Sequence, residues 1–123
     1  MVTEGKAQVL RIYIGSSDKL KHTPMYEAIV MEAKRFGIAR ASVFRGILSY
    51  GAHSQLHSAK IWALSTDLPL IIEIVDEKEK ILAFIDHLSE WFEATDFGGM
   101  ITTYEVEIIK YQGHKNRQTE QSK

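Results

Sequence analysis

Residues 70–85 read LIIEIVDEKEKILAFI, and the hydrophobic period changes within this stretch. Leu70 to Val75 form a short apolar run with a single glutamate, which is typical of a buried strand. Asp76 and Glu79 form a capping pattern that predicts the start of a helix. Beyond them, apolar residues recur three and four positions apart. The stretch therefore predicts a strand followed directly by an amphipathic helix.

The same order occurs earlier in the chain. Apolar and polar residues alternate over 8–14, which predicts a strand. After a polar connection, Thr23 supplies an N-cap and Pro24 a proline at the first helical position. Helical spacing continues to Phe36, and Gly37 suits the left-handed residue that ends many helices. We therefore expect a second strand and helix here.

Two more strands complete the pattern. Residues 42–48 alternate, and Gly46 within them predicts the close approach of another backbone. Residues 100–111 form the last strand, and the connection 49–69 has the length typical of functional segments. The order is strand, helix, strand, long connection, strand, helix, strand. It predicts an α+β, ferredoxin-like βαββαβ fold, in which an antiparallel four-stranded sheet carries both helices on one face.

The two faces of the predicted sheet differ in composition. One face is purely apolar and is expected under the helices, with Leu10, Ile12, Ile14, Leu70, Ile72 and Ile74. The other face is mixed and is assigned Val9, Arg11, Tyr13, Val43, Arg45, Ile47, Ile71, Glu73, Val75, Glu105 and Glu107. An unpaired buried charge costs several kcal/mol. We therefore expect the mixed face to form an interface between copies, in which the charges pair.

Composition limits the classes of function. The formal net charge of -1 gives no broad positive field, which argues against a nucleic-acid partner. The chain has no cysteine, which excludes disulfides and thiolate chemistry. No apolar run approaches the ~18 residues of a membrane span, so we expect a cytoplasmic protein without membrane insertion. We expect one domain over residues 1–112 and a disordered polar tail over 113–123.

The first candidate site lies on and beyond the strand 42–48. It comprises Arg45, Gly46, Tyr50, Gly51 and His57. A guanidinium, a bare backbone and an aromatic face together suit a phosphate and a base. The alternative is an interface arginine beside a flexible loop.

The second candidate site is the turn before the last strand, with Gly98, Gly99 and Met100. Exposed amide groups in such a turn can form an anion-binding nest. An ordinary turn is the alternative, because adjacent glycines are common in turns.

His53 and His57 are weak candidates for a metal pair. They lie four residues apart, which places both imidazoles on one face of a helix. No neighbouring cysteine, aspartate or glutamate within the loop completes a ligand set, so the alternative is that these histidines are exposed to solvent or stack on a nucleotide. No carboxylate has an evident nucleophile beside it, and we expect no catalytic residues.

Several separate motifs resemble an uncharacterised family of PII-like (GlnB-like) proteins. They are Leu10 to Gly15, Ser17 to Lys19, Pro24 to Val30, Arg45-Gly46, Tyr50 to Ala52, His57 to Lys60 and Leu68 to Asp76. The resemblance covers roughly residues 8 to 111 and implies a ferredoxin-like homotrimer related to the PII nitrogen regulators and to CutA. It also implies a regulatory protein with adenine-nucleotide phosphates held in the cleft between subunits by a glycine turn, here 97–101.

The resemblance further implies that the loop 49–57 contacts a partner protein. Some members are encoded near fluoride-export channels, which makes a membrane channel one candidate partner. This chain departs from the family at Ser16, where an acidic residue is usual, and at Gln55, where an arginine is usual. Its turn also lacks the basic residue that helps hold ATP, so AMP or a small anion is favoured over ATP. The alternatives are a CutA-like protein that handles divalent metals, and a small cofactorless enzyme.

Overall fold

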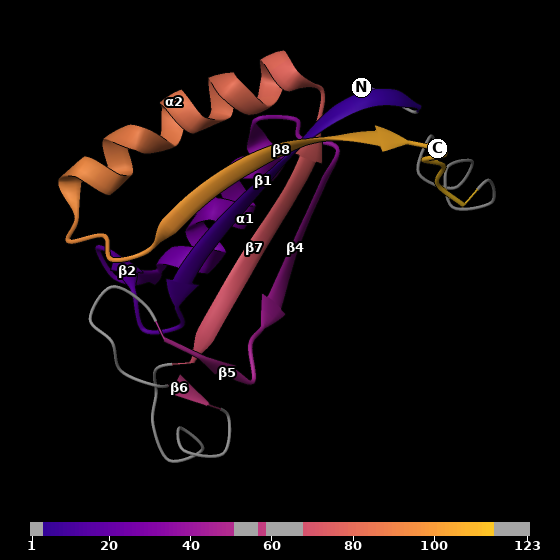
Figure 1. The fold of residues 1–123 in the computed structure, drawn as a ribbon. Helices are drawn as coiled ribbons and strands as arrows, with labels where there is room; N and C mark the ends of the chain where they lie inside the picture. The colour runs from indigo at the N-terminus through magenta and orange to yellow at the C-terminus, as the bar shows by residue number, and fades with distance from the viewer. Residues whose placement is uncertain (1–3, 51–56, 59–67, 115–123) are drawn as a thin grey trace.

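The computed structural model describes residues 4–50, 57–58 and 68–114 (Figure 1). Its elements are β1 (Gly5–Gly15), β2 (Lys19–Leu20), β3 (Thr23–Pro24), α1 (Met25–Arg35), β4 (Arg40–Arg45), β5 (Leu48–Ser49), β6 (His57–Ser58), β7 (Pro69–Asp76), α2 (Lys78–Ala94) and β8 (Met100–Ile108). The main sheet has the order β4-β7-β1-β8, and all neighbouring strands are antiparallel. Both helices lie on one face of this sheet (Figure 1). The predicted ferredoxin-like fold is confirmed.

The core lies between this sheet and the helices. Cross-strand pairing sets Leu10 against Ile74 and Ile12 against Ile72, and all four side chains are fully buried. The helices cover them with a layer of apolar side chains, namely Met25, Ile29, Ala33, Ile81, Phe84 and Leu88. The face predicted to lie under the helices is therefore correct.

Both helices begin later in the chain than their predicted N-caps imply. Pro24 is itself the N-cap of α1, and Glu77 is the N-cap of α2. Asp76 instead ends β7, where its side chain is 1% exposed. Its carboxylate accepts hydrogen bonds from the backbone N–H of Ala39 at 2.8 Å and of Glu77 at 2.7 Å. The Asp76 side chain therefore links the end of β7 by a hydrogen bond to Ala39, the residue before β4, and is not the N-cap of α2.

The composition of the open face is partly different from the prediction. Val43 and Arg45 pair with Ile72 and Leu70, which places them on the helix side of β4. Glu105 pairs with Gln8, and Glu107 with Lys6, so both glutamates also point to the helix side. The prediction extended the odd and even alternation of β1 and β7 to the outer strands. Their faces are set by cross-strand register, which the alternation within one strand does not specify.

The open face carries three cross-strand rows. They are Arg40–Val75–Val9–Tyr104, Ser42–Glu73–Arg11–Thr102 and Phe44–Ile71–Tyr13–Met100. In the middle row, Arg11 donates to Glu73 at 2.8 and 3.0 Å, and its guanidinium lies 5.6 Å from the centroid of the Tyr104 ring. Hydrogen bonds with the side chains of Tyr13 and then Glu73 raise the pKa of Arg11. The central charges of this face thus pair with each other within the chain.

The long connection begins and ends close to the lower end of the sheet in Figure 1. β5 and β6 pair as a short antiparallel hairpin, with Leu48 opposite Ser58 and Ser49 opposite His57. Residues 51–56 and 59–67 lie outside the described residues, as does 115–123, which is most of the predicted tail.

Candidate functional site

Arg45 and Gly46 end the edge strand β4. Arg45 is exposed and pairs with Leu70 of β7. The Gly46 N–H donates to the Pro69 carbonyl at 2.8 Å, and a Cβ on Gly46 would lie 3.3 Å from Pro69 Cγ. The predicted close approach at Gly46 is confirmed. It fixes the backbone directly after Arg45, so the Arg45 side chain starts from a defined position at this end of the sheet.

The remaining members of the first candidate site lie beside the β5–β6 hairpin. Tyr50 follows β5 and is 73% exposed. His57 belongs to β6 by its backbone, while its side chain, Gly51 and His53 fall outside the described residues. The metal pair His53 and His57 and the ligand roles of Gly51 and His57 therefore stay predictions.

The second candidate site has a packing reason for one of its glycines. A Cβ on Gly99 would lie 2.1 Å from the carbonyl oxygen of Tyr13, whereas a Cβ on Gly98 would meet nothing within 4 Å. Neither glycine has a positive φ, so the alternation of right- and left-handed residues that builds a nest is not formed here. Met100 begins β8 opposite Tyr13 and is 53% exposed. Gly99 is thus required by the close approach of the Tyr13 carbonyl on the neighbouring strand, and ligand binding by this turn stays a prediction.

The two candidate sites lie at the same end of the sheet but on opposite edges. Arg45 pairs with Leu70, Leu70 pairs with Ile14, and the neighbouring Tyr13 pairs with Met100. Three strand spacings of about 4.8 Å separate the edges by roughly 14 Å. β7 and β1 therefore stand between Arg45 and the glycine turn within one chain.

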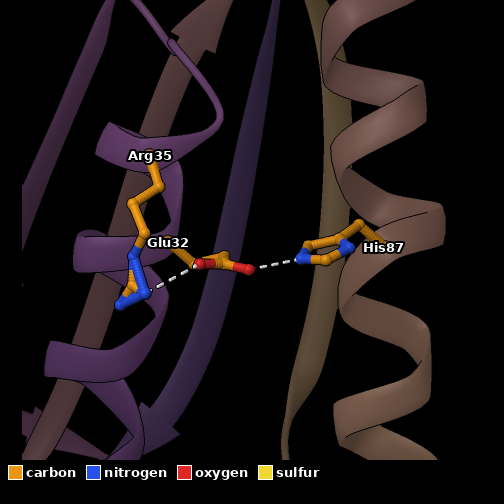
Figure 2. A network of polar contacts seen from close by, with 3 residues as sticks. All are labelled: Glu32, Arg35 and His87. Atoms are coloured by element: carbon orange, nitrogen blue, oxygen red, sulfur yellow. Dashed lines mark hydrogen bonds and ion pairs between the residues drawn. The ribbon is translucent and has the colours of Figure 1, made fainter.

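A polar cluster that the sequence analysis missed joins the two helices (Figure 2). His87 Nε2 lies 2.5 Å from Glu32 Oε2, and Arg35 lies 3.4 Å from the other carboxylate oxygen. Three aromatic rings lie near the His87 ring. Their centroid distances from it are 5.5 Å for Phe36, 6.4 Å for Phe84 and 6.1 Å for Trp91. The signal in the sequence was the spacing of Phe84, His87 and Trp91, which places His87 on an apolar stripe of α2. The cluster lies on the helical layer and connects α1 to α2.

We expect His87→Ala to lower the free energy of unfolding by about 1–2 kcal/mol, because it removes a hydrogen bond to a carboxylate and the ring packing. The Glu32 side chain is only 17% exposed, so water replaces the lost partner incompletely. Urea denaturation measures the change. Arg35→Ala is the control, because its side chain is 64% exposed and exposed pairs contribute little. Equal losses in the two variants would show that His87 has no special role.

Two further observations apply to the described part of the chain. No helix in it is long and apolar enough to cross a membrane. No group of three or more His, Cys, Asp or Glu side chains in it is arranged to hold a metal ion.

Comparisons with known proteins place this fold in a family. The model of DUF190, described as "Uncharacterized ACR, COG1993", matches residues 7–108. A UPF0166 protein of Aquifex aeolicus is 33% identical over 104 residues, which cover 85% of this chain and 94% of that protein. A UPF0166 protein of Methanocaldococcus jannaschii is 35% identical over 105 residues, which again cover 85% of this chain and 94% of that protein.

Among solved structures, CPII of Thiomonas intermedia K12 shares the fold. CPII is a nitrogen regulatory PII-like protein, and the structure contains ADP, AMP and bicarbonate. The two structures superpose with a TM-score of 0.63 at 14% sequence identity, and the match covers 87% of this chain and 92% of the CPII chain. The PII-like character expected from the motifs is therefore confirmed at the level of the fold. With a family model over most of its length and relatives that are one-third identical, this chain belongs to the DUF190 (UPF0166) family of uncharacterised proteins, and its fold is similar to that of the PII-like protein CPII.

Proposed function

We propose that this chain is a cytoplasmic, homotrimeric regulatory protein that binds an adenine nucleotide, AMP in preference to ATP, in the clefts between its subunits. The observation that carries the proposal is the placement of the two candidate sites. Arg45 and the Gly98–Met100 turn lie at one end of the sheet but on opposite edges. One small ligand can contact both only where the edges of two copies meet.

The chemistry of these residues favours a ligand of low charge. Arg45 is the cation at the end of β4, and its planar guanidinium can donate two parallel hydrogen bonds to a phosphate. The sequence contains no lysine or arginine between Trp91 and Ile109, so the glycine turn offers amide groups without a cation. A monophosphate needs fewer charges neutralised than a triphosphate does. The bound ADP and AMP of CPII support this class of ligand.

The β5–β6 hairpin is the part that we assign to a protein partner. Leu48 and Tyr50 are 61% and 73% exposed, and Ile47 just before them is 78% exposed. Adjacent exposed apolar side chains are typical of protein-binding surfaces. The segment 49–57 would report the bound ligand by changing its order, as switch loops do, and a membrane channel is one candidate for the partner.

Isothermal titration calorimetry against AMP, ADP, ATP and cyclic AMP tests the proposal, with the mass measured by light scattering on the same sample. We expect AMP to bind more tightly than ATP, with one site per subunit of a trimer. Arg45→Ala should weaken AMP binding at least about tenfold, because a charge-assisted phosphate contact contributes about 1.5–3 kcal/mol.

Arg35→Ala is the matched control, since it removes the same charge from the helical layer, where Arg35 contacts Glu32. Its affinity for AMP should equal that of the wild type. Unchanged affinity in Arg45→Ala would refute the role of Arg45. A panel without any binding would refute the nucleotide itself.

A further inference from the structure

We infer that the β2–β3 hairpin supplies positive charge to the phosphate of the nucleotide, with Lys19 and Lys21 as the residues that contact it. The inference rests on the proposed function and adds phosphate contacts from the same chain as the glycine turn. Three observations carry it, namely the position of the hairpin, the charges at this end of the sheet, and the residue types at the hairpin tip.

The hairpin begins close to the glycine turn. Tyr13 of β1 pairs with Met100 at the start of β8. Continuing this register by two residues brings Gly15, the end of β1, to the level of Gly98. The hairpin starts at Lys19, and Figure 1 shows β2 at this end of the sheet. It therefore follows directly the strand that lies next to the turn.

Hydrogen bonds hold the hairpin at its base. The Asp18 N–H donates to the Gly15 carbonyl at 3.3 Å, and the Gly15 N–H donates to the Asp18 carboxylate at 3.0 Å. The Met25 N–H donates to the Asp18 carbonyl at 2.7 Å, which closes the other end of the hairpin. A turn of this kind spans less than about 7 Å, so the Cα of Lys19 lies within roughly 11 Å of the Cα of Gly15. The long side chain of lysine can reach a phosphate held by the turn amides from there.

The hairpin exposes its two lysines to solvent. Leu20 is half-buried and packs against the hydrophobic core. Lys19 and Lys21 flank it in the sequence and are exposed. Neither lysine forms an ion pair with another residue in the described ranges 4–50, 57–58 and 68–114. Their charges are therefore available to a ligand.

The surroundings of the glycine turn are acidic. The sequence has no lysine or arginine between Trp91 and Ile109, while Glu93 and Asp96 precede the turn and are exposed. These carboxylates repel a phosphate, so a phosphate at the turn needs a cation from another segment. The one acidic residue of the hairpin, Asp18, already accepts a backbone hydrogen bond. With two lysines against one carboxylate, the hairpin contributes positive charge beside the turn.

The residue types at the hairpin tip do not suit so tight a turn. Leu20 pairs with Thr23, which leaves Lys21 and His22 as the two turn residues. Lys21 has a φ of 58°, and two-residue turns with a positive φ at this position favour glycine, because a Cβ is strained there. A residue that opposes the local turn geometry is expected where function requires its side chain. The tip thus carries a positive charge although glycine suits its backbone better.

Calorimetric titration of AMP and of adenosine tests the inference, because adenosine lacks the phosphate. Lys19→Gln should weaken AMP binding about tenfold, as expected for a lost charge-assisted contact, and should leave the affinity for adenosine unchanged. Lys19→Arg keeps the charge and should retain most of the affinity for AMP. Lys34→Gln is the matched control, since Lys34 is an exposed lysine in the last turn of α1, at the opposite end of the sheet. Its affinity for AMP should equal that of the wild type.

Lys21→Gly separates binding from folding. Glycine suits the positive φ, so the urea midpoint of this variant should be no lower than that of the wild type. Its affinity for AMP should nevertheless fall and should depend less on salt concentration, because one screened charge contact is lost. A lower urea midpoint with unchanged affinity for AMP would show that Lys21 serves only the turn, and would overturn its role at the phosphate.

The result for each ligand distinguishes the inference from the proposed function. If Lys19→Gln binds AMP as tightly as Lys34→Gln does, the inference is overturned and the proposed function stands. Equal losses of affinity for AMP and adenosine also overturn the inference, because the phosphate then has no part in the effect. A wild-type protein that binds none of the nucleotides refutes the proposed function together with the inference that rests on it.

Discussion

Gly99→Ala is expected to destabilise the protein by about 2–3 kcal/mol or more, the upper range for forcing extra atoms into a filled space. The added Cβ would lie 2.1 Å from the carbonyl oxygen of Tyr13, a backbone atom that cannot rotate away. Relief requires β8 to shift away from β1 at the Tyr13–Met100 pair. Urea denaturation at one protein concentration measures the loss, because the proposed assembly would make stability depend on concentration.

Gly98→Ala is the matched control for this prediction. It changes the neighbouring glycine, and its Cβ would meet no atom within 4 Å. We expect its stability to stay within about 0.5 kcal/mol of the wild type. Similar losses in both variants would contradict the steric explanation. Gly98→Ala is also the better variant for ligand titrations. A loss of affinity in Gly99→Ala could result from misfolding as well as from the loss of a ligand contact.

Asp76→Ala is expected to lower the free energy of unfolding by about 2–6 kcal/mol, because it leaves two backbone N–H groups without their acceptor, at about 1–3 kcal/mol each. These are the N–H groups of Ala39 and Glu77, bonded to a carboxylate that is 1% exposed. The hydroxyl of Tyr111 donates to the Ala39 carbonyl at 2.7 Å. Both the N–H and the carbonyl of Ala39, the residue before β4, are therefore hydrogen-bonded to side chains. Thermal and urea unfolding both report the loss.

Asp86→Ala, on the exposed surface of α2, is the control for charge removal and should change stability by no more than about 0.5 kcal/mol. Asp76→Asn keeps one carbonyl acceptor and is expected to fall between the alanine variant and the wild type. If Asp76→Ala is as stable as Asp86→Ala, the two hydrogen bonds to Asp76 do not contribute to the stability of the fold.

The order of elements followed from local patterns because those patterns have local causes. The apolar faces of β1 and β7 alternate with period two, and the stripe of α2 recurs with the helical period. Gly46 was recognised because a glycine inside an alternating run indicates close approach, and Pro69 provides it. The helix boundaries differ from the prediction. The carboxylate of Asp76 has the chemistry of a helix cap, and only the position of Ala39 shows that it serves another segment.

The candidate site was predictable in its residue types but not in its arrangement. An arginine before a glycine and a Gly-Gly turn are visible in the sequence, yet nothing local says that they occupy opposite edges of one sheet. That fact depends on the order β4-β7-β1-β8, which is a property of the whole chain. The steric requirement for glycine at position 99 is also not visible in the sequence, because Tyr13 is distant from it along the chain.

By itself, the sequence of this protein determined the fold class, the apolar face of the sheet and the family, because these depend on periodicity and on contiguous motifs. Tertiary structure alone decided which side of β4 and β8 each residue occupies, since register is set by pairing between distant strands. It also decided that Arg11 forms an ion pair with Glu73 within the chain, and that His87 contacts Glu32 between the helices. Contacts between distant segments depend on how the whole chain packs, and no local pattern encodes them.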